Sequence, residues 1–176
     1  GELHLEVIEY RIRSEKNVQV VTSNPIVVYR ESVQKKTPTD FEGKSPNKHN
    51  KLFFLVEPLS EEIGAKIKKG DIPSGRVKKK NVEFRNKFVD CGMVTKVADK
   101  VKDVYQGNVF IDGTRGIVYI NEIMELVLDM FEEVMRQGPL AREPGIKVMV
   151  TMTDCKLHED AIHRGPAQMY PAVREG

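Results

Sequence analysis

The sequence predicts an α/β fold of the α+β two-layer sandwich type, in which a four-stranded sheet is covered by helices on one face. Short apolar runs rich in β-branched residues are interspersed with longer segments whose apolar residues recur at helical spacing. Most of the predicted strands are separated by a helix or by a long polar loop, which is typical of a sheet with packed helices. The chain of 176 residues is long enough for one domain with a hydrophobic core.

The predicted strands differ in how clearly the sequence marks them. Leu52–Val56 is a continuous apolar run with polar residues on both sides, which is typical of a buried strand. The last strand alternates apolar with more polar residues, so one of its faces should be more buried than the other. The four predicted strands of the sheet are Ile26–Val33, Lys51–Val56, Asn108–Asp112 and Ile146–Thr153.

Helical spacing of apolar residues predicts four helices in the same region. The strongest of them carries a wide apolar stripe and ends at Gly138. In the first of them Ser60 is the predicted N-cap, and Gly70 follows the last lysines. The predicted helices are Pro58–Lys69, Gly75–Val89, Met93–Tyr105 and Tyr119–Gln137.

The sequence also contains two polar stretches. Gln34–Asn50 is interrupted by prolines and a glycine, so we expect a long exposed loop there. Long loops in compact domains are often functional. The last residues, Tyr170–Gly176, form a second polar segment.

The N-terminal residues are predicted to belong to a different unit. Glu2–Arg13 has helical spacing, and Asn17–Thr22 is typical of a short strand. This pair is too small to bury a core alone, so we expect residues 1–22 to be the end of a preceding domain and residues 23–176 to be the next domain. The chain begins at Gly1 without an initiator Met, and we therefore expect it to be part of a longer protein.

Composition places the chain among soluble globular proteins. Hydrophobic residues make up 40% and charged residues 31%, and no apolar run approaches the roughly 18 residues that a membrane span requires. The N-terminus lacks the basic and apolar regions of a secretory signal. The two cysteines lie far apart, which favours reduced thiols and a cytoplasmic location. Because the net charge is only +2, any nucleic-acid contact must come from local patches.

Two of the four histidines, His158 and His163, lie shortly after the last predicted strand. On a helix, at about 100° per residue, their spacing separates the side chains by about 140°, and on a strand they would face opposite sides. A loop at the end of a strand could bring them to one target, and loops held by a rigid scaffold often carry binding residues. The segment Asp154–Gln168 is therefore the first candidate functional site.

The residues alone leave several kinds of chemistry open for this segment. Cys155, His158 and His163, with Glu159 or Asp160, could bind zinc, although they complete only half of a zinc motif. The two histidines and Asp160 could also act as an acid/base group. One hypothesis is therefore a small metal-dependent or acid/base enzyme centred on Cys155, His158 and His163. Cysteine at a strand end is more often a small core residue, and the sequence contains no phosphate-binding loop, dinucleotide fingerprint or nucleophile elbow.

A second polar segment, Lys44–Lys51, favours nucleic-acid contact. It combines three lysines with a histidine, two asparagines and a serine, which are the usual partners of phosphate and sugar groups. Asparagine and histidine can also reach or stack on bases. The alternative interpretation is a solvated loop without a partner. The candidate residues after the last strand are His158, His163, Arg164 and Gln168.

Two strings of residues in these segments are distinctive: Ser45-Pro46-Asn47-Lys48-His49-Asn50 and Asp160-Ala161-Ile162-His163-Arg164-Gly165. Together with Gly1–Glu6, Ser23–Glu31 and Gly116–Glu122, in the same order, they resemble the translation elongation factor 2 family, the translocase relatives of elongation factor G. The resemblance covers nearly the whole chain. The pair Pro166-Ala167 departs from the Gly-Gly of the eukaryotic His-Arg-Gly-Gly-Gly-Gln pattern, which favours the archaeal type and implies a stiffer loop.

This resemblance implies a fragment that holds the end of domain III, residues 1–22, and most of domain IV, residues 23–176. It implies that domain IV has a fold like the second domain of ribosomal protein S5. The GTPase domain of the family, with its GTP and Mg²⁺, is expected to lie outside this chain. The fragment itself is therefore expected to be no enzyme and to hold no cofactor or metal.

The resemblance also implies a site and its partners. Domain IV of the family enters the decoding-centre A site of the small ribosomal subunit and contacts tRNA and mRNA during translocation. His163 matches the histidine that the family modifies to diphthamide, so the diphthamide-synthesis enzymes and ADP-ribosylating toxins of the diphtheria type are implied partners, and a membrane is not. The residues expected to contact RNA are Ser45, Pro46, Asn47, Lys48, His49, Asn50, His158, Asp160, Arg164, Gly165 and Gln168.

Overall fold

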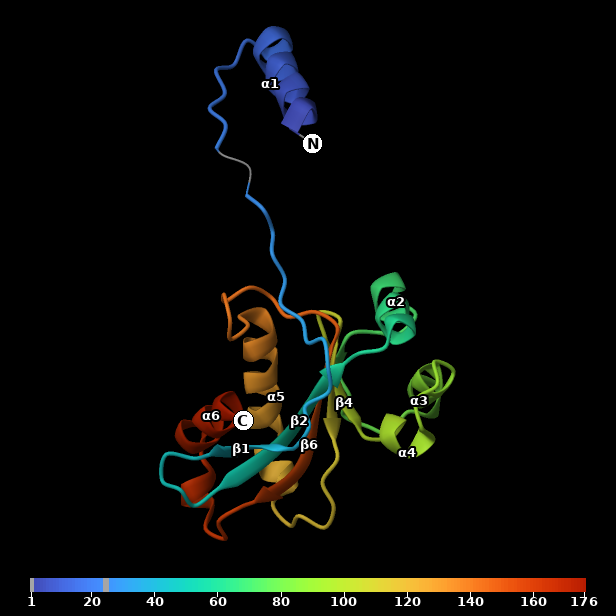
Figure 1. Ribbon diagram of the computed structural model, residues 1–176, viewed down its shortest axis with the longest axis vertical. Coiled ribbons are helices and arrows are strands. Elements are labelled where there is room, and N and C mark those ends of the chain that lie inside the picture. Colours follow the sequence, from blue (N-terminus) through green and yellow to red (C-terminus); the bar gives the residue numbers. More distant parts are fainter. Residues whose placement is uncertain (1, 24–25) are drawn as a thin grey trace.

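The computed structural model describes residues 2–23 and 26–176, and one sheet of six strands runs through the body of this part of the chain (Figure 1). The strands are ordered β1-β2-β6-β5-β4-β3. β5 and β6 run parallel, and every other neighbouring pair is antiparallel. The predicted α/β class is confirmed, but the sheet has six strands rather than four. The strands are β1 (Phe41–Lys44), β2 (Lys51–Pro58), β3 (Gly75–Arg76), β4 (Val101–Tyr105), β5 (Asn108–Asp112) and β6 (Val148–Lys156).

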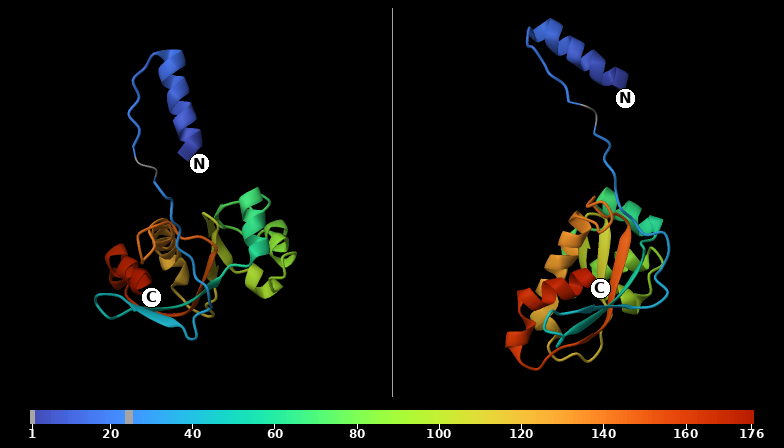
Figure 2. Two further views of the ribbon diagram at one scale, coloured as in Figure 1. Left: turned by 45° about the horizontal axis from the view of Figure 1, so that its top comes forward. Right: turned by 60° about the vertical axis from the view of Figure 1, so that its left-hand side comes forward.

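Helices cover both faces of the sheet, so the expectation of helices on one face is wrong (Figures 1 and 2). On one face lie α5 (Ile120–Arg136) and α6 (Pro166–Glu175). On the other face lie α2 (Glu61–Lys69), α3 (Val82–Val89) and α4 (Thr95–Ala98).

A hydrophobic core lies on each face of the sheet, and β5 contributes side chains to both. Phe110 packs in the core beneath α5, whereas Val109 and Ile111 point to the opposite face and pack with α2, α3 and α4. All three side chains are completely buried or nearly so. A continuous apolar run is the pattern of a strand covered on both faces, and the sequence contains that pattern here.

α5 provides the apolar surface of the larger core and confirms the predicted helix Tyr119–Gln137 to within one residue at each end. Ile123, Val127 and Phe131 form its buried stripe, and the ring of Phe131 packs 5.2 Å from the ring of Phe110. Within the described ranges, neither α5 nor another helix is both long enough and apolar enough to cross a membrane.

The predicted helix Met93–Tyr105 is wrong after Ala98, where the chain turns into β4. β4 pairs with β5 through a two-residue turn at Gln106 and Gly107, whose φ angles are 47° and 82°. Positive φ at both positions is the signature of a type I′ hairpin turn, which suits the twist of two antiparallel strands.

A bulge explains why the valines of β4 are spaced like those of a helix. The register against β5 shifts between Val101 and Asp103, so Val101 and Val104 both face the core of α2, α3 and α4 although they lie three residues apart. Three-residue spacing of apolar residues normally indicates a helix, and the bulge produces it here within a strand.

The predicted helix Pro58–Lys69 is confirmed as α2, whereas the predicted helix after it is only partly correct. The Ser60 hydroxyl accepts a hydrogen bond from the Ile63 N–H at the start of α2, and Gly70 ends the helix at a φ of 85°. The predicted helix Gly75–Val89 is helical only from Val82, where Asn81 is the N-cap, and its first residues form β3 instead.

Both polar stretches contain regular structure. β1 lies within Gln34–Asn50, which was predicted to be a loop, and pairs with β2. The polar segment Tyr170–Gly176 lies largely in α6, which also packs against β1. That contact requires Gly43, because a Cβ atom there would lie 1.8 Å from the backbone oxygen of Ala172.

The N-terminal part stands apart from the body (Figures 1 and 2). The predicted helix Glu2–Arg13 is confirmed as α1 (Glu2–Lys16), but the predicted strands Asn17–Thr22 and Ile26–Val33 are wrong where the structure describes them, and only Glu31 forms an isolated bridge, to Gly145. A boundary at residues 22–23 remains a prediction. Gly1, Asn24 and Pro25, which belong to two of the family-like strings, lie outside the described residues. Exposed apolar side chains of α1 include Leu3, Leu5, Val7, Ile8 and Tyr10.

Candidate functional site

Two segments far apart in the sequence form the end of the body away from α1 (Figure 1), and we call this end the tip. It consists of residues 45–50, between β1 and β2, and residues 157–168, after β6. The sheet brings them together because Lys51 pairs with Lys44 of β1 on one side and with Lys156 of β6 on the other. Both segments therefore start from neighbouring strand ends.

Asn50 joins the two segments of the tip. Its side-chain amide donates to the backbone carbonyl of His163 at 2.7 Å and accepts from the backbone N–H of His158 at 3.0 Å. Asn50 is completely buried, and its backbone N–H also bonds to the Ser45 hydroxyl at 3.0 Å. One buried side chain thus fixes the backbone on both sides of the histidine segment.

The turn 45–50 is closed by its own polar groups and by α6. The backbone N–H of Ser45 donates to the carbonyl of Asn50 at 3.0 Å, and Lys48 adopts a left-handed conformation at the turn, with φ of 62°. The backbone N–H of Asn47 donates to the Gln168 side chain at 3.0 Å. The turn is therefore fixed relative to α6 as well as to β2.

Arg164 holds the histidine segment to the start of α5. Its guanidinium donates to the backbone carbonyls of His158 and Glu159 and to the carboxylate of Glu122, and it lies 4.0 Å above the ring of Tyr119. The Arg164 side chain is almost completely buried. A planar guanidinium suits this position because it can bond several acceptors in its plane while an aromatic ring covers its face.

Three imidazole rings meet on the surface of the tip. The ring centroids of His158 and His163 lie 4.4 Å apart, and each lies 5.0 Å from the centroid of His49. Nδ1 of His158 accepts from the backbone N–H of Asp160 at 3.0 Å, so the proton of a neutral His158 ring lies on Nε2. The expectation that a loop could bring His158 and His163 together is confirmed, and His49 joins them from the other segment.

The structure divides the residues predicted to contact RNA into two groups. Ser45, Asn50 and Arg164 are buried and bonded inside the tip, so the expectation that these side chains face a partner is corrected. Most of their polar groups bond within the tip or, for Arg164, also to Glu122 of α5. The remaining residues reach the surface at least in part: Pro46, Asn47, Lys48, His49, His158, Asp160, His163, Gly165 and Gln168.

The metal-binding alternative loses one of its proposed ligands. Cys155 is buried in the core beneath α5 and α6 rather than in the histidine cluster. Burial, together with the nearby Asp154 and Asp112, raises the pKa of its thiol to about 12, so the thiolate form that binds metals is disfavoured. Within residues 2–23 and 26–176, the structure contains no group of three or more His, Cys, Asp or Glu side chains that could hold a metal ion.

Two residues that support the tip from the start of α5 were not recognised as functional from the sequence. Tyr119 and Glu122 support Arg164, but the sequence marked them only as the start of a helix. No local pattern links them to residues more than 40 positions away, so only the packing of α5 against the tip reveals the contact. Ile162, on the short 3-10 helix Ala161–Arg164, is 77% exposed and adds an apolar group beside the histidines.

Comparison with known proteins places this arrangement in a family. The family model described as "Elongation factor G, domain IV" matches residues 65–176, which include β4, β5, β6, α5 and the histidine segment of the tip. The chain belongs to the elongation factor G domain IV family. The resemblance noted in the sequence is thereby confirmed.

Curated relatives of this domain IV chain extend the match to nearly its full length. "Elongation factor 2" of Methanosarcina acetivorans is 54% identical over 175 residues, which is 99% of this chain and 23% of the relative. "Elongation factor 2" of Pyrococcus horikoshii is 50% identical and that of Thermococcus onnurineus 52% identical, each over 174 residues, 99% of this chain and 24% of the relative. The chain thus spans about a quarter of the length of these relatives.

Proposed function

We propose that this chain is the part of an archaeal-type elongation factor 2 that enters the decoding-centre A site of the small ribosomal subunit and contacts tRNA and mRNA during translocation. The observation that carries the proposal is the tip: three imidazole rings and a lysine are presented at the end of a sheet by a buried hydrogen-bond network. Membership of the domain IV family supports the same conclusion.

The chemistry of the tip suits contact with RNA of any sequence. Imidazole rings can stack on bases or bond to sugar hydroxyls, and such contacts do not depend on the identity of a codon. The exposed Lys48 can bond to phosphate. Lys44 and Lys51 both pair with the carboxylate of Glu42, at 2.9 Å and 3.3 Å, so part of their charge is already compensated. Lys48 should therefore provide a larger share of the charge-dependent binding.

We further propose that His163 is the residue that becomes diphthamide. Its ring reaches the surface, while its backbone carbonyl is held by Asn50, so the ring can carry a long modification without releasing the loop. A permanent cation on a long arm would extend the reach of the ring across a wide RNA groove. The diphthamide-synthesis enzymes, and ADP-ribosylating toxins of the diphtheria type, would then recognise this tip.

The proposal assigns no catalysis to this chain. Hydrolysis of GTP, with Mg²⁺, would belong to another part of the full-length protein, and domain IV would act in the cytoplasm as the part that contacts RNA. The tip is suited to this task because its shape is set by buried bonds rather than by the partner, so binding requires little ordering of the loop.

The proposal is tested by measuring how the chain binds isolated small ribosomal subunits over a range of salt concentrations. Lys48→Ala and His49→Ala should weaken binding, and Lys48→Ala should also reduce the salt dependence because one phosphate contact is lost. Lys68→Ala, on α2 and away from the tip, is the matched control. Equal binding by the tip variants and the control would overturn the proposed interface. Mass spectrometry of the His163 peptide from the native source tests the modification separately.

A further inference from the structure

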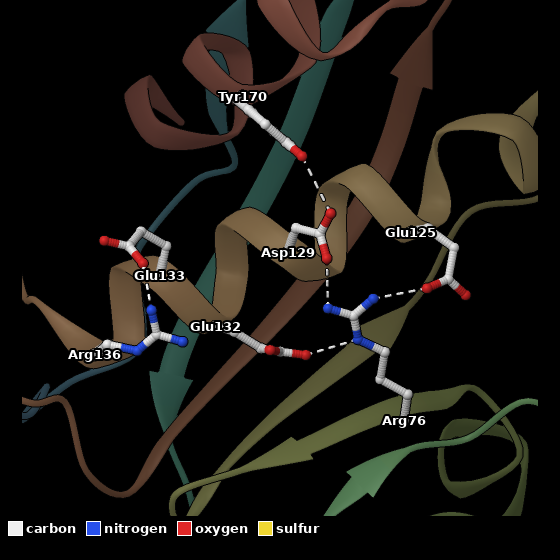
Figure 3. A network of polar contacts seen from close by, with 7 residues as sticks. All are labelled: Arg76, Glu125, Asp129, Glu132, Glu133, Arg136 and Tyr170. Carbon is white, nitrogen blue, oxygen red and sulfur yellow. Dashed lines mark hydrogen bonds and ion pairs between the residues drawn. The ribbon is translucent and has the colours of Figure 1, made fainter.

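A network of charged side chains joins β3 and α5 (Figure 3). The guanidinium of Arg76 bonds to three carboxylates on one face of α5: Glu125 at 2.7 Å, Asp129 at 2.6 Å and Glu132 at 2.7 Å. Tyr170 of α6 donates to the second oxygen of Asp129 at 3.1 Å. The single positive charge of Arg76 therefore faces three carboxylates, so the network carries an excess of negative charge.

A fourth carboxyl group lies beneath this network. Asp103 of β4 is directly opposite Arg76 in the β3–β4 pairing, but the Arg76 guanidinium bonds to α5 instead. Asp103 is only 1% exposed, and neither of its oxygens has a hydrogen-bond partner among the described residues. A buried carboxylate without a partner is strongly unfavourable, so an ionised Asp103 would be difficult to accommodate here.

The charged groups near Asp103 act on its ionisation in opposite directions, Glu132 against it and Arg76 in favour of it. Glu132 approaches it from α5, and Arg76 approaches it from β3. Glu125 and Asp129 are held by the same guanidinium, so its positive charge is shared with them. On the opposite side, the β5 residue paired with Asp103 is Phe110, which carries no charge.

We propose that Asp103 and Glu132 bind one proton between them, and that this proton holds β4 against α5. With one of the two carboxyl groups protonated, an O–H donor is available to the other, and the repulsion between two neighbouring carboxylates is removed. The proposal concerns the core of the domain and does not depend on the proposed RNA contact.

The electrostatic surroundings support this assignment. Burial and the neighbouring Glu132 together raise the pKa of Asp103 to about 7, against the opposing effect of Arg76. Because the two carboxyl groups interact, the value near 7 belongs to the pair rather than to Asp103 alone. The proton is therefore bound below neutral pH and released above it.

The proposal predicts the sign of a pH effect on stability. The native state holds the proton up to about pH 7, whereas an unfolded aspartate loses it near pH 4. Between these values the native state binds more protons than the unfolded state, so this pair lowers the stability of the domain as pH rises. Above pH 7 the contribution becomes constant.

The experiment measures urea unfolding of the full chain from pH 5 to pH 8, together with ¹³C NMR titration of the aspartate and glutamate carboxyl groups. In Asp103→Asn the amide donates to Glu132 at every pH, so the fall of the urea midpoint between pH 5 and 7 should be smaller than in the wild type. Asp71→Asn, which changes an exposed aspartate, should keep the wild-type slope.

Two variants test the shared proton, because they should shift the pH at which Asp103 titrates in opposite directions. Glu132→Gln removes a neighbouring negative charge and should lower the pH at which Asp103 titrates, whereas Arg76→Gln removes a positive charge and should raise it. A wild type in which Asp103 and Glu132 both titrate near pH 4 would overturn the proposal, and so would an unchanged slope in Asp103→Asn. The wild-type titration decides the question even if one of the variants does not fold.

Discussion

The side-chain amide of Asn50 donates to the backbone carbonyl of His163 at 2.7 Å, although the two residues are 113 positions apart. The same amide accepts from the N–H of His158, so the two ends of the histidine segment are tied to one point on the neighbouring loop. The shape of the tip therefore depends on a side chain that a partner cannot touch. Its conformation should be much the same with or without RNA.

Asn50→Ala should loosen the tip and lower the free energy of unfolding. The change leaves the half-buried His158 N–H without its partner and the His163 carbonyl with only the 3.5 Å contact from the Asn47 side chain, which costs about 1–3 kcal/mol. Urea unfolding measures the loss, and hydrogen exchange should become faster at residues 157–165. Asn121→Ala, an exposed position on α5, is the control and should change neither quantity.

Replacing Arg164 by lysine should not rescue the loss seen in Arg164→Ala. Lysine carries the charge but cannot bond two carbonyls and a carboxylate at once while covering the ring of Tyr119. Both variants should lose about 1–3 kcal/mol, since the hydrogen bonds involved include a charged donor. A lysine variant with wild-type stability in thermal unfolding would show that the Arg164 geometry is unimportant.

His163→Ala should leave the fold intact and remove the ring cluster. The ring lies beside the rings of His49 and His158 at the surface of the tip, and the backbone carbonyl of His163 still bonds to Asn50. Changes at such surface positions stay within about 0.5 kcal/mol. Thermal unfolding and circular dichroism provide the measurement, and a marked drop in the unfolding temperature would mean that the ring supports the core.

Gly43→Ala and Gly64→Ala should change stability in opposite directions. A Cβ atom on Gly43 would lie 1.8 Å from the backbone oxygen of Ala172, so β1 and α6 would have to move apart at a cost of about 1–3 kcal/mol. A Cβ atom on Gly64, inside α2, would meet only the Lys147 side chain at 3.9 Å, and alanine there should gain up to about 1 kcal/mol of helix propensity. Urea unfolding of both variants checks the contrast.

Glu31 should stabilise the domain above about pH 4.5 and lose that effect as pH falls. Burial acts to raise its pKa, but hydrogen bonds from the N–H groups of Leu140, Ala141 and Glu143 outweigh it, and the pKa is lowered from the ordinary value of 4.5. A lowered pKa in the native state means that protonation favours unfolding.

The prediction for Glu31 is checked by following urea unfolding of Glu31→Gln and the wild type from pH 7 to pH 3. The difference between them should shrink as the wild-type carboxyl becomes protonated. Glu62→Gln, at an exposed position of α2, serves as the control. A constant difference across this range would show that the three N–H bonds do not depend on the charge.

The sequence predicted the correct element where the buried apolar residues are continuous or recur at regular helical spacing. β2 and α5 were predicted because Leu52 and Phe54 lie in an unbroken apolar run and because Ile123, Val127 and Phe131 repeat along one helical face. β4 was missed because a bulge gives its valines helical spacing. β1 was missed because a polar edge strand with a glycine at its centre has no apolar pattern.

The sequence by itself determined which residues form the tip, because the strings around Asn50 and His163 carry the family's identity in their residue types. Only the tertiary structure decided what each residue does there. Burial depends on contacts with other parts of the fold, and it turned Asn50 and Arg164 from expected RNA contacts into internal supports. Asn50 reaches His163 across 113 positions, and Arg164 reaches Glu122 across 42. The tertiary structure also places His49 against His163 and Asp103 beside Glu132. The sequence could not predict either contact, because no local pattern links the residues involved.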